Sequence, residues 1–132
     1  MANAVLGIDF GAKRVGLALA KPGSAPQRLA TLPANDELIM ALGRQITAHG
    51  VGTVVVGLPR NLDGDDTAQT AVARKFAARL QAAYPALPVE LQDEALTSAT
   101  ARQRLSPPQL KGTGGLLDQE AAVIILEDYL RG

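Results

Sequence analysis

Near its N-terminus the chain carries the stretch Val5-Leu6-Gly7-Ile8-Asp9-Phe10-Gly11-Ala12-Lys13-Arg14-Val15-Gly16. The apolar residues before Asp9 predict a buried strand, and the glycine turn that follows carries two cations. A carboxylate at the end of a buried strand is costly unless a positive group satisfies it. The position of Asp9 therefore predicts a metal ion or a phosphate-bearing ligand beside it.

The length and composition indicate one globular domain, which we expect to span residues 1–132 around a single core. Hydrophobic residues make up 47% of the chain and charged residues 20%, which is typical of globular proteins. The absence of cysteine excludes disulfides, thiolate zinc sites and cysteine nucleophiles. A metal ion would need oxygen ligands, with one histidine as the only nitrogen candidate.

The distribution of charge is more informative than its sum, because 13 basic residues balance 13 acidic ones. Three stretches carry cations and no acid, namely Phe10–Asn35, Thr67–Val89 and Ala95–Leu117. This clustering predicts a basic surface that binds nucleic acid, separate from the carboxylates. The first apolar run is interrupted at Asp9 and no run reaches membrane-spanning length, so we expect a cytoplasmic protein with no membrane partner.

The order of the predicted elements indicates an α/β domain with a mixed five-stranded sheet. Apolar and β-branched runs predict strands at Val5–Phe10, Arg14–Ala20, Gln27–Leu32, Thr53–Gly57 and Val89–Gln92. Helical spacing and capping residues predict helices at Asp36–His49, Thr67–Ala83, Ser98–Leu105 and Leu117–Leu130. We expect Gly50 to end the first helix and Gln109–Gly115 to form a loop.

Two further carboxylates are candidates for the site. Asp118 lies one turn before Ala122, at the head of the apolar stripe of the last helix; an ordinary first-turn aspartate favoured by the helix dipole is the alternative. Glu94 lies at the exit of a strand, where Asp93 and Glu94 point to opposite faces; a solvated acidic loop is the alternative.

Asp9, Glu94 and Asp118 together have the chemistry of a Mg²⁺ or Mn²⁺ site, since they offer hard oxygen ligands and leave room for water and phosphate. Two such ions could activate a water and stabilise the leaving oxygen of a phosphodiester. Separation along the sequence says nothing about the distances between these residues.

Four motifs, in order over nearly the whole chain, resemble the YqgF (RuvX) family. They are Gly7-Ile8-Asp9-Phe10-Gly11-Ala12-Lys13-Arg14-Val15-Gly16, Val55-Val56-Gly57-Leu58-Pro59-Arg60-Asn61-Leu62-Asp63-Gly64, Asp93-Glu94-Ala95-Leu96-Thr97 and Asp118-Gln119-Glu120-Ala121-Ala122.

This resemblance implies an RNase H-like fold with sheet order 3-2-1-4-5 and the first strand in the centre. It also implies that Asp9, Glu94 and Asp118 form the acidic triad of a nuclease that uses magnesium or manganese. The implied activity is hydrolysis of phosphodiester bonds, either to process the 5′ end of pre-16S rRNA in ribosome biogenesis or to resolve Holliday junctions. We expect a monomer or weak homodimer.

The chain departs from the family at two positions, and both remove positive charge where substrate phosphate would lie. The usual Asp-Glu-Arg-Leu-Thr motif here has Ala95 in place of arginine. The loop before Asp118, often rich in lysine, contributes only Lys111.

The remaining candidates are substrate contacts. Lys13 and Arg14 follow the Asp9 turn and could bind phosphate or offset the acids, or lie at a solvated hairpin tip. Arg60 and Asn61 follow a strand, in the region where ligands bind in open α/β sheets. His49 fits a helix C-terminus and is not assigned to the site.

Two other classes of function compete with a nuclease. One is a nucleic-acid-binding factor with vestigial chemistry in transcription or ribosome assembly, which the missing arginine suggests. The other is a sugar-kinase or actin-like phosphate binder. Such proteins close two domains over a nucleotide, whereas this chain is long enough for one and has no G-x-x-x-x-G-K-[ST] loop.

Overall fold

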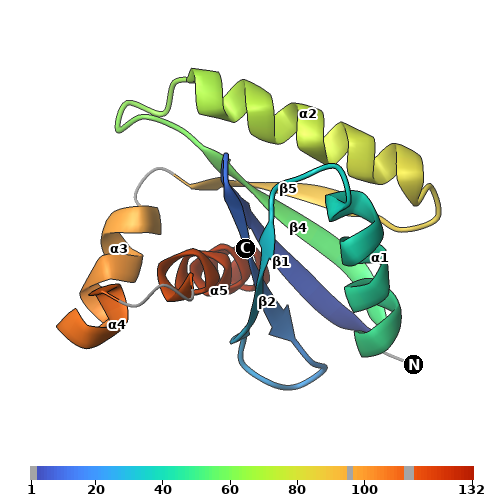
Figure 1. Ribbon diagram of the computed structural model, residues 1–132, viewed down its shortest axis with the longest axis horizontal. Helices are drawn as coiled ribbons and strands as arrows, with labels where there is room; N and C mark the ends of the chain where they lie inside the picture. The colour runs from blue at the N-terminus through green and yellow to red at the C-terminus, as the bar shows by residue number, and fades with distance from the viewer. Residues whose placement is uncertain (1–2, 95–96, 112–114) are drawn as a thin grey trace.

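The computed structural model describes residues 3–94, 97–111 and 115–132 and builds one mixed sheet with helices on both faces (Figure 1). The elements in chain order are β1 (Ala4–Phe10), β2 (Arg14–Ala20), β3 (Gln27–Pro33), α1 (Leu38–His49), β4 (Val51–Pro59), α2 (Ala68–Ala83), β5 (Val89–Glu94), α3 (Thr97–Arg104), α4 (Pro107–Lys111) and α5 (Leu116–Arg131). The sheet order β3-β2-β1-β4-β5 confirms the predicted order and places β1 in the centre.

Long-range pairing sets the ends of the last two strands. β4 and β5 pair in parallel from Val54 opposite Val89 to Pro59 opposite Glu94. This ladder carries β5 two residues beyond the predicted end at Gln92, through Asp93 and Glu94. The prediction ended early because two acidic residues have low strand propensity, which pairing with a buried neighbour overrides.

Helix α1 begins at Leu38, so its N-cap is Glu37 and not the predicted Asp36. The side chain of Asn35 accepts a hydrogen bond from the N–H of Glu37 at 3.0 Å, and its carbonyl accepts one from Leu38 at 3.1 Å. This local turn delays the helix by one residue. The predicted end is confirmed: Gly50 has φ 62° and its N–H bonds the carbonyls of Ile46 and Thr47.

Helix α4 corrects the predicted loop at Gln109–Gly115, since residues up to Lys111 are helical. The N–H of Gln109 donates to the hydroxyl of Ser106 at 3.4 Å, and the side-chain oxygen of Gln109 accepts from the N–H of Ser106 at 2.8 Å. Proline suits the first helical position, so Pro107 ends one helix and begins another. The rest of that loop, residues 112–114, and the departure at Ala95 lie outside the described residues.

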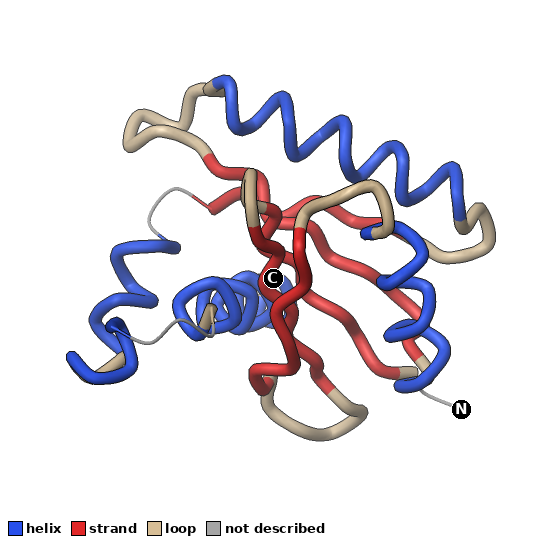
Figure 2. The backbone as a smooth tube through the Cα atoms, in the orientation of Figure 1, coloured by secondary structure: helices blue, strands red, loops and turns tan. Residues whose placement is uncertain are grey.

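The helices divide between the two faces of the sheet, with α1 and α2 on one and α5 on the other (Figure 2). The α1/α2 face buries large side chains, including Leu6, Leu17 and Leu42. The α5 face is lined by small residues such as Ala18 and Ala20. Within the described ranges, no helix combines the length and apolarity needed to cross a lipid bilayer.

Candidate active site

Asp9 projects from the carboxyl end of the central strand. Side chains alternate between the faces of a strand. Ile8 and Phe10 pack with the core under α1 and α2, whereas a side chain at Gly7 would meet Leu126 of α5. Asp9 shares the parity of Gly7 and therefore faces α5.

Helix α5 lies close against the sheet at Gly16, the residue that pairs with Asp9 across β1 and β2. A Cβ atom at Gly16 would lie 2.1 Å from the carbonyl oxygen of Asp118 and 2.7 Å from its Cβ. Only glycine permits this approach. A glycine inside a strand pattern is the sequence signal for such a contact, although it does not reveal which segment makes it.

Two hydrogen bonds fix the first turn of α5 on β3. The side-chain amide of Gln119 donates to the Thr31 hydroxyl at 2.8 Å, and that hydroxyl donates to the carbonyl of Gly115 at 3.3 Å. The sequence does not predict these positioning residues, because the two hydrogen bonds join residues that are separated by 84 and 88 positions along the chain and share no local pattern. Together with Gly16 they hold Asp118 beside Asp9.

The two neighbouring carboxyl groups of Asp9 and Asp118 favour a positive charge beside them. Burial raises the pKa of Asp9 from its ordinary value of 3.8 to about 7, and the negative charge of Asp118 adds to that increase. The guanidinium of Arg14 contacts the other partner, with 3.0 Å between its Nε and Oδ2 of Asp118. The side chain of Arg14 is 59% exposed, so it is free to reach solvent or a ligand.

Glu94 lies on the same face of the sheet. Its side chain is buried, and its Cγ would lie 3.8 Å from a Cβ atom at Gly57, at a point where β4 also meets Ile125 of α5. Asp93 points the other way and accepts a 3.0 Å bond from Nε of Arg60. The prediction that the two adjacent acids face opposite ways is therefore confirmed.

The described residues include no group of three or more His, Asp or Glu side chains positioned to hold a metal ion. The structure thus puts Asp9, Glu94 and Asp118 on one face of the sheet without closing them into a ligand cage. The donor set still fits a divalent cation, because the buried carboxyl of Asp9 lies beside the negative charge of Asp118, and a guanidinium already lies against Asp118.

The predicted substrate contacts Arg60 and Asn61 shape the loop that follows β4. Arg60 bonds Asp93, the carbonyl of Gly64 at 3.3 Å and the carboxylate of Asp66. The side chain of Asn61 accepts bonds from the N–H groups of residues 63 and 65 at 3.1 and 2.9 Å. The roles of Arg60 and Asn61 in binding substrate stay predictions. The same holds for Lys13 and Lys111, whose side chains are exposed.

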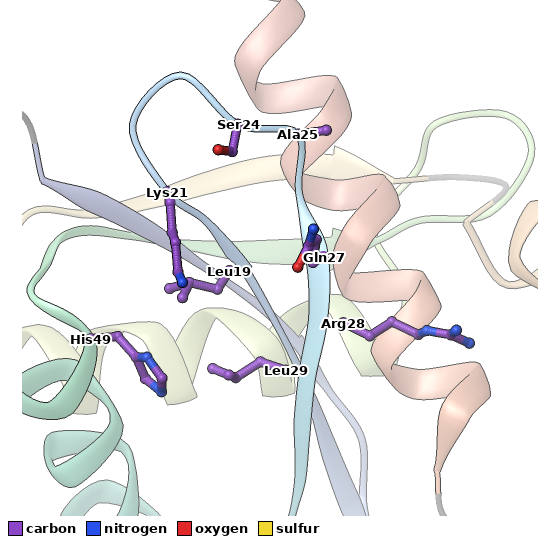
Figure 3. Close-up of a pocket in the computed structure, with 8 residues that line it drawn as sticks. All are labelled: Leu19, Lys21, Ser24, Ala25, Gln27, Arg28, Leu29 and His49. Carbon is purple, nitrogen blue, oxygen red and sulfur yellow. The ribbon is translucent and has the colours of Figure 1, made fainter.

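A separate pocket of about 320 Å³ lies at the turn between β2 and β3, at the far end of β2 from Gly16 (Figure 3). Lys21 and His49 point into it, whereas Arg28 points away toward α5. None of the predicted catalytic or substrate-binding residues lines it, so the candidate active site is distinct from this hollow.

Comparison with known proteins identifies the family. The sequence model of RuvX, described as "Holliday junction resolvase", matches residues 3–132. The chain belongs to the RuvX family. This membership confirms the resemblance carried by the four motifs and the prediction that the chain is a nuclease, hence a hydrolase.

Two curated relatives cover nearly the full chain. A protein of Maridesulfovibrio salexigens is 40% identical over 96% of both chains, and one of Methylobacillus flagellatus is 42% identical over 97% of this chain and 90% of its own. Both are named "Putative pre-16S rRNA nuclease".

Solved structures agree on the fold. Thermus thermophilus RuvC in complex with a Holliday junction substrate has a TM-score of 0.56 at 17% identity, covering 97% of this chain and 95% of its own. The fowlpox virus Holliday junction resolvase has a TM-score of 0.55 at 12% identity, covering 97% and 98%. These resolvase structures confirm the predicted RNase H-like fold.

Proposed function

We propose that this RuvX-family chain is a metal-dependent endonuclease that processes precursor 16S rRNA, with Asp9, Glu94 and Asp118 as its catalytic carboxylates. The observation that carries the proposal is the approach of Asp118 to Asp9 across Gly16, at a point where burial, and with it the negative charge of Asp118, raises the pKa of Asp9. The names of the relatives at about 40% identity support the RNA substrate.

Asp9 and Asp118 are the residues that would hold the ion, and Mg²⁺ or Mn²⁺ suits their hard oxygen atoms. When bound, the ion supplies a lowered pKa for water and a positive charge for the phosphodiester oxygens. Asp9 would hold such a cation as a carboxylate, because a positive charge beside it would offset the effects of burial and of Asp118 that raise its pKa. In this proposal Arg14 and Lys13 would bind substrate phosphate, and Glu94, whose buried side chain lies on the same face of the sheet, would accept a proton from water.

Resolution of branched DNA is the second candidate function. The description of the family model favours it, and two solved structures with this fold are Holliday junction resolvases or their complexes. The same carboxylates would serve either substrate, because both reactions hydrolyse a phosphodiester bond. Cleaving a four-way junction symmetrically would further require two copies of the chain.

The test is cleavage of a pre-16S RNA fragment and a synthetic four-way DNA junction, side by side, with Mg²⁺, Mn²⁺ or EDTA. We expect cation-dependent cleavage of the RNA that Asp9→Asn abolishes. Asp128→Asn, which removes a carboxylate at the far end of α5, is the matched control and should cleave normally.

Cleavage of the junction alone would assign the chain to the second candidate. Tight binding of RNA without cleavage in either metal would indicate a binding factor instead. Normal cleavage by Asp9→Asn would contradict the assignment of Asp9 as a catalytic carboxylate.

A further inference from the structure

A second pocket, of about 200 Å³, begins at the residue that follows Asp9. It lies on the α1/α2 face, between the turn after β1, the segment before α1 and the middle of α2, which are neighbours in Figure 1. Phe10 lines this pocket, and its neighbour Asp9 points to the opposite face of β1. Because consecutive Cα atoms are about 3.8 Å apart, the pocket and the catalytic face lie on the two sides of the same strand end. The residues that line it include Phe10, Asn35, Asp36, Ile39, Phe76 and Arg79.

One wall of this pocket is aromatic. The ring of Phe10 stacks on that of Phe76, with 4.4 Å between their centroids and 16° between their planes. Phe76 is 3% exposed and anchors the pair in the core, whereas Phe10 is partly exposed. The pocket therefore has a fixed ring on which a third flat group can pack, with Ile39 as an aliphatic neighbour.

The rim of the pocket carries opposite charges that do not meet. Arg79 and Asp36 both line it, yet neither forms an ion pair or a hydrogen bond through its side chain with any residue in the described ranges. Asn35 adds an amide whose oxygen accepts a hydrogen bond from Glu37 and whose nitrogen has no partner in the part of the chain that the structure describes. A ligand suited to this rim has a negative group for Arg79 and polar hydrogens for Asp36.

We propose that this pocket binds one base of the substrate strand, next to the phosphate held on the catalytic face; this rests on the proposed nuclease function. A nucleotide combines a flat ring for Phe10, a phosphate for Arg79 and, on three of the four RNA bases, an amino group for Asp36. Stacking of single-stranded bases on aromatic side chains is a common mode of binding. Uracil lacks an amino group and should be the poorest occupant.

The first experiment uses the Asp9→Asn protein, so that binding is measured without cleavage. Single-stranded RNA oligonucleotides carry 2-aminopurine at each position in turn, and its fluorescence reports stacking. We expect quenching at one position, lost in Phe10→Leu, and affinity about ten-fold weaker in Arg79→Ala. Lys75→Ala removes a cation from the same helix outside the pocket and is the control.

The second experiment compares short oligo(A), oligo(C) and oligo(U) on the same protein. Oligo(U) should bind several-fold more weakly than the others, and Asp36→Ala should remove that difference. No quenching at any position, or an Arg79→Ala effect no larger than that of Lys75→Ala, would overturn the proposal. Base binding by a protein that cleaves nothing would instead contradict only the nuclease function, so the two failures are distinguishable.

Discussion

The two faces of the central sheet are built from residues of different size. On the α1/α2 face, Leu6, Ile8 and Leu17 meet helices that carry Leu42 and Phe76. On the α5 face the sheet offers Gly7, Gly16, Ala18, Ala20 and Gly57. Large side chains bury apolar area, whereas small ones let a helix backbone approach. Both faces bury apolar side chains, but only the α5 face also sets the distance between Asp9 and Asp118, because its small residues let the helix approach the sheet.

The largest expected effect comes from placing a larger side chain on the α5 face with Gly16→Val. Its Cβ would collide with the backbone of Asp118, so α5 must move away from Asp9. We expect a loss of about 4 kcal/mol or more in the free energy of unfolding, together with loss of cleavage. Urea denaturation and the cleavage assay measure the two effects. Ala25→Val, on an exposed turn, is the control, and equal stability of both variants would contradict the close approach.

The next effect is pH dependence on the same face. Because burial raises the pKa of Asp9 from 3.8 to about 7, the folded state holds its proton more tightly than the unfolded state. Stability in EDTA should fall as the pH rises from about 4 to about 7, by up to about 4 kcal/mol. Asp9→Asn should flatten this fall, and Mn²⁺ should offset it at pH 8. Parallel pH profiles of wild type and Asp9→Asn would show that the carboxyl titrates normally.

The α1/α2 face is tested by Leu42→Ala, which removes a fully buried side chain from α1. We expect about 3 kcal/mol of destabilisation. The carboxylates lie on the other face, so the variant should keep the pH profile of Asp9 and cleave normally at low temperature, where it stays folded. Loss of cleavage by folded Leu42→Ala would show that the two faces are not independent.

The smallest effect on stability is expected for Arg14→Ala, because ion pairs as exposed as that of Arg14 with Asp118 contribute under about 1 kcal/mol. Its effect on substrate should be larger, with RNA affinity several-fold weaker. Filter binding and thermal unfolding measure the two. Arg131→Ala removes another exposed, paired arginine at the far end of α5 and should leave RNA binding unchanged. Equal affinities for the two variants would limit Arg14 to positioning Asp118.

Local patterns predicted much of the fold. The apolar run after the glycine turn predicts β2 at Arg14–Ala20 with its observed ends, and Gly50 ends helix α1 as predicted. Ser106 and Gln109 have the spacing of a capping box, which is a signal for helix α4. The sequence prediction did not include this helix, because Pro107 and Pro108 also mark the end of the preceding helix. The end of β5 at Glu94 was missed because only pairing with β4 keeps those acids extended.

The sequence by itself determined which groups are available for chemistry: hard oxygen donors, no thiols, and Asp9 at the end of a buried strand. These are properties of single residues and their immediate neighbours. Only the tertiary structure decided that Asp118, more than one hundred positions along the chain, lies against Gly16 and beside Asp9. The raised pKa of Asp9 follows from that meeting, because burial and a second negative charge exist only after distant segments pack together.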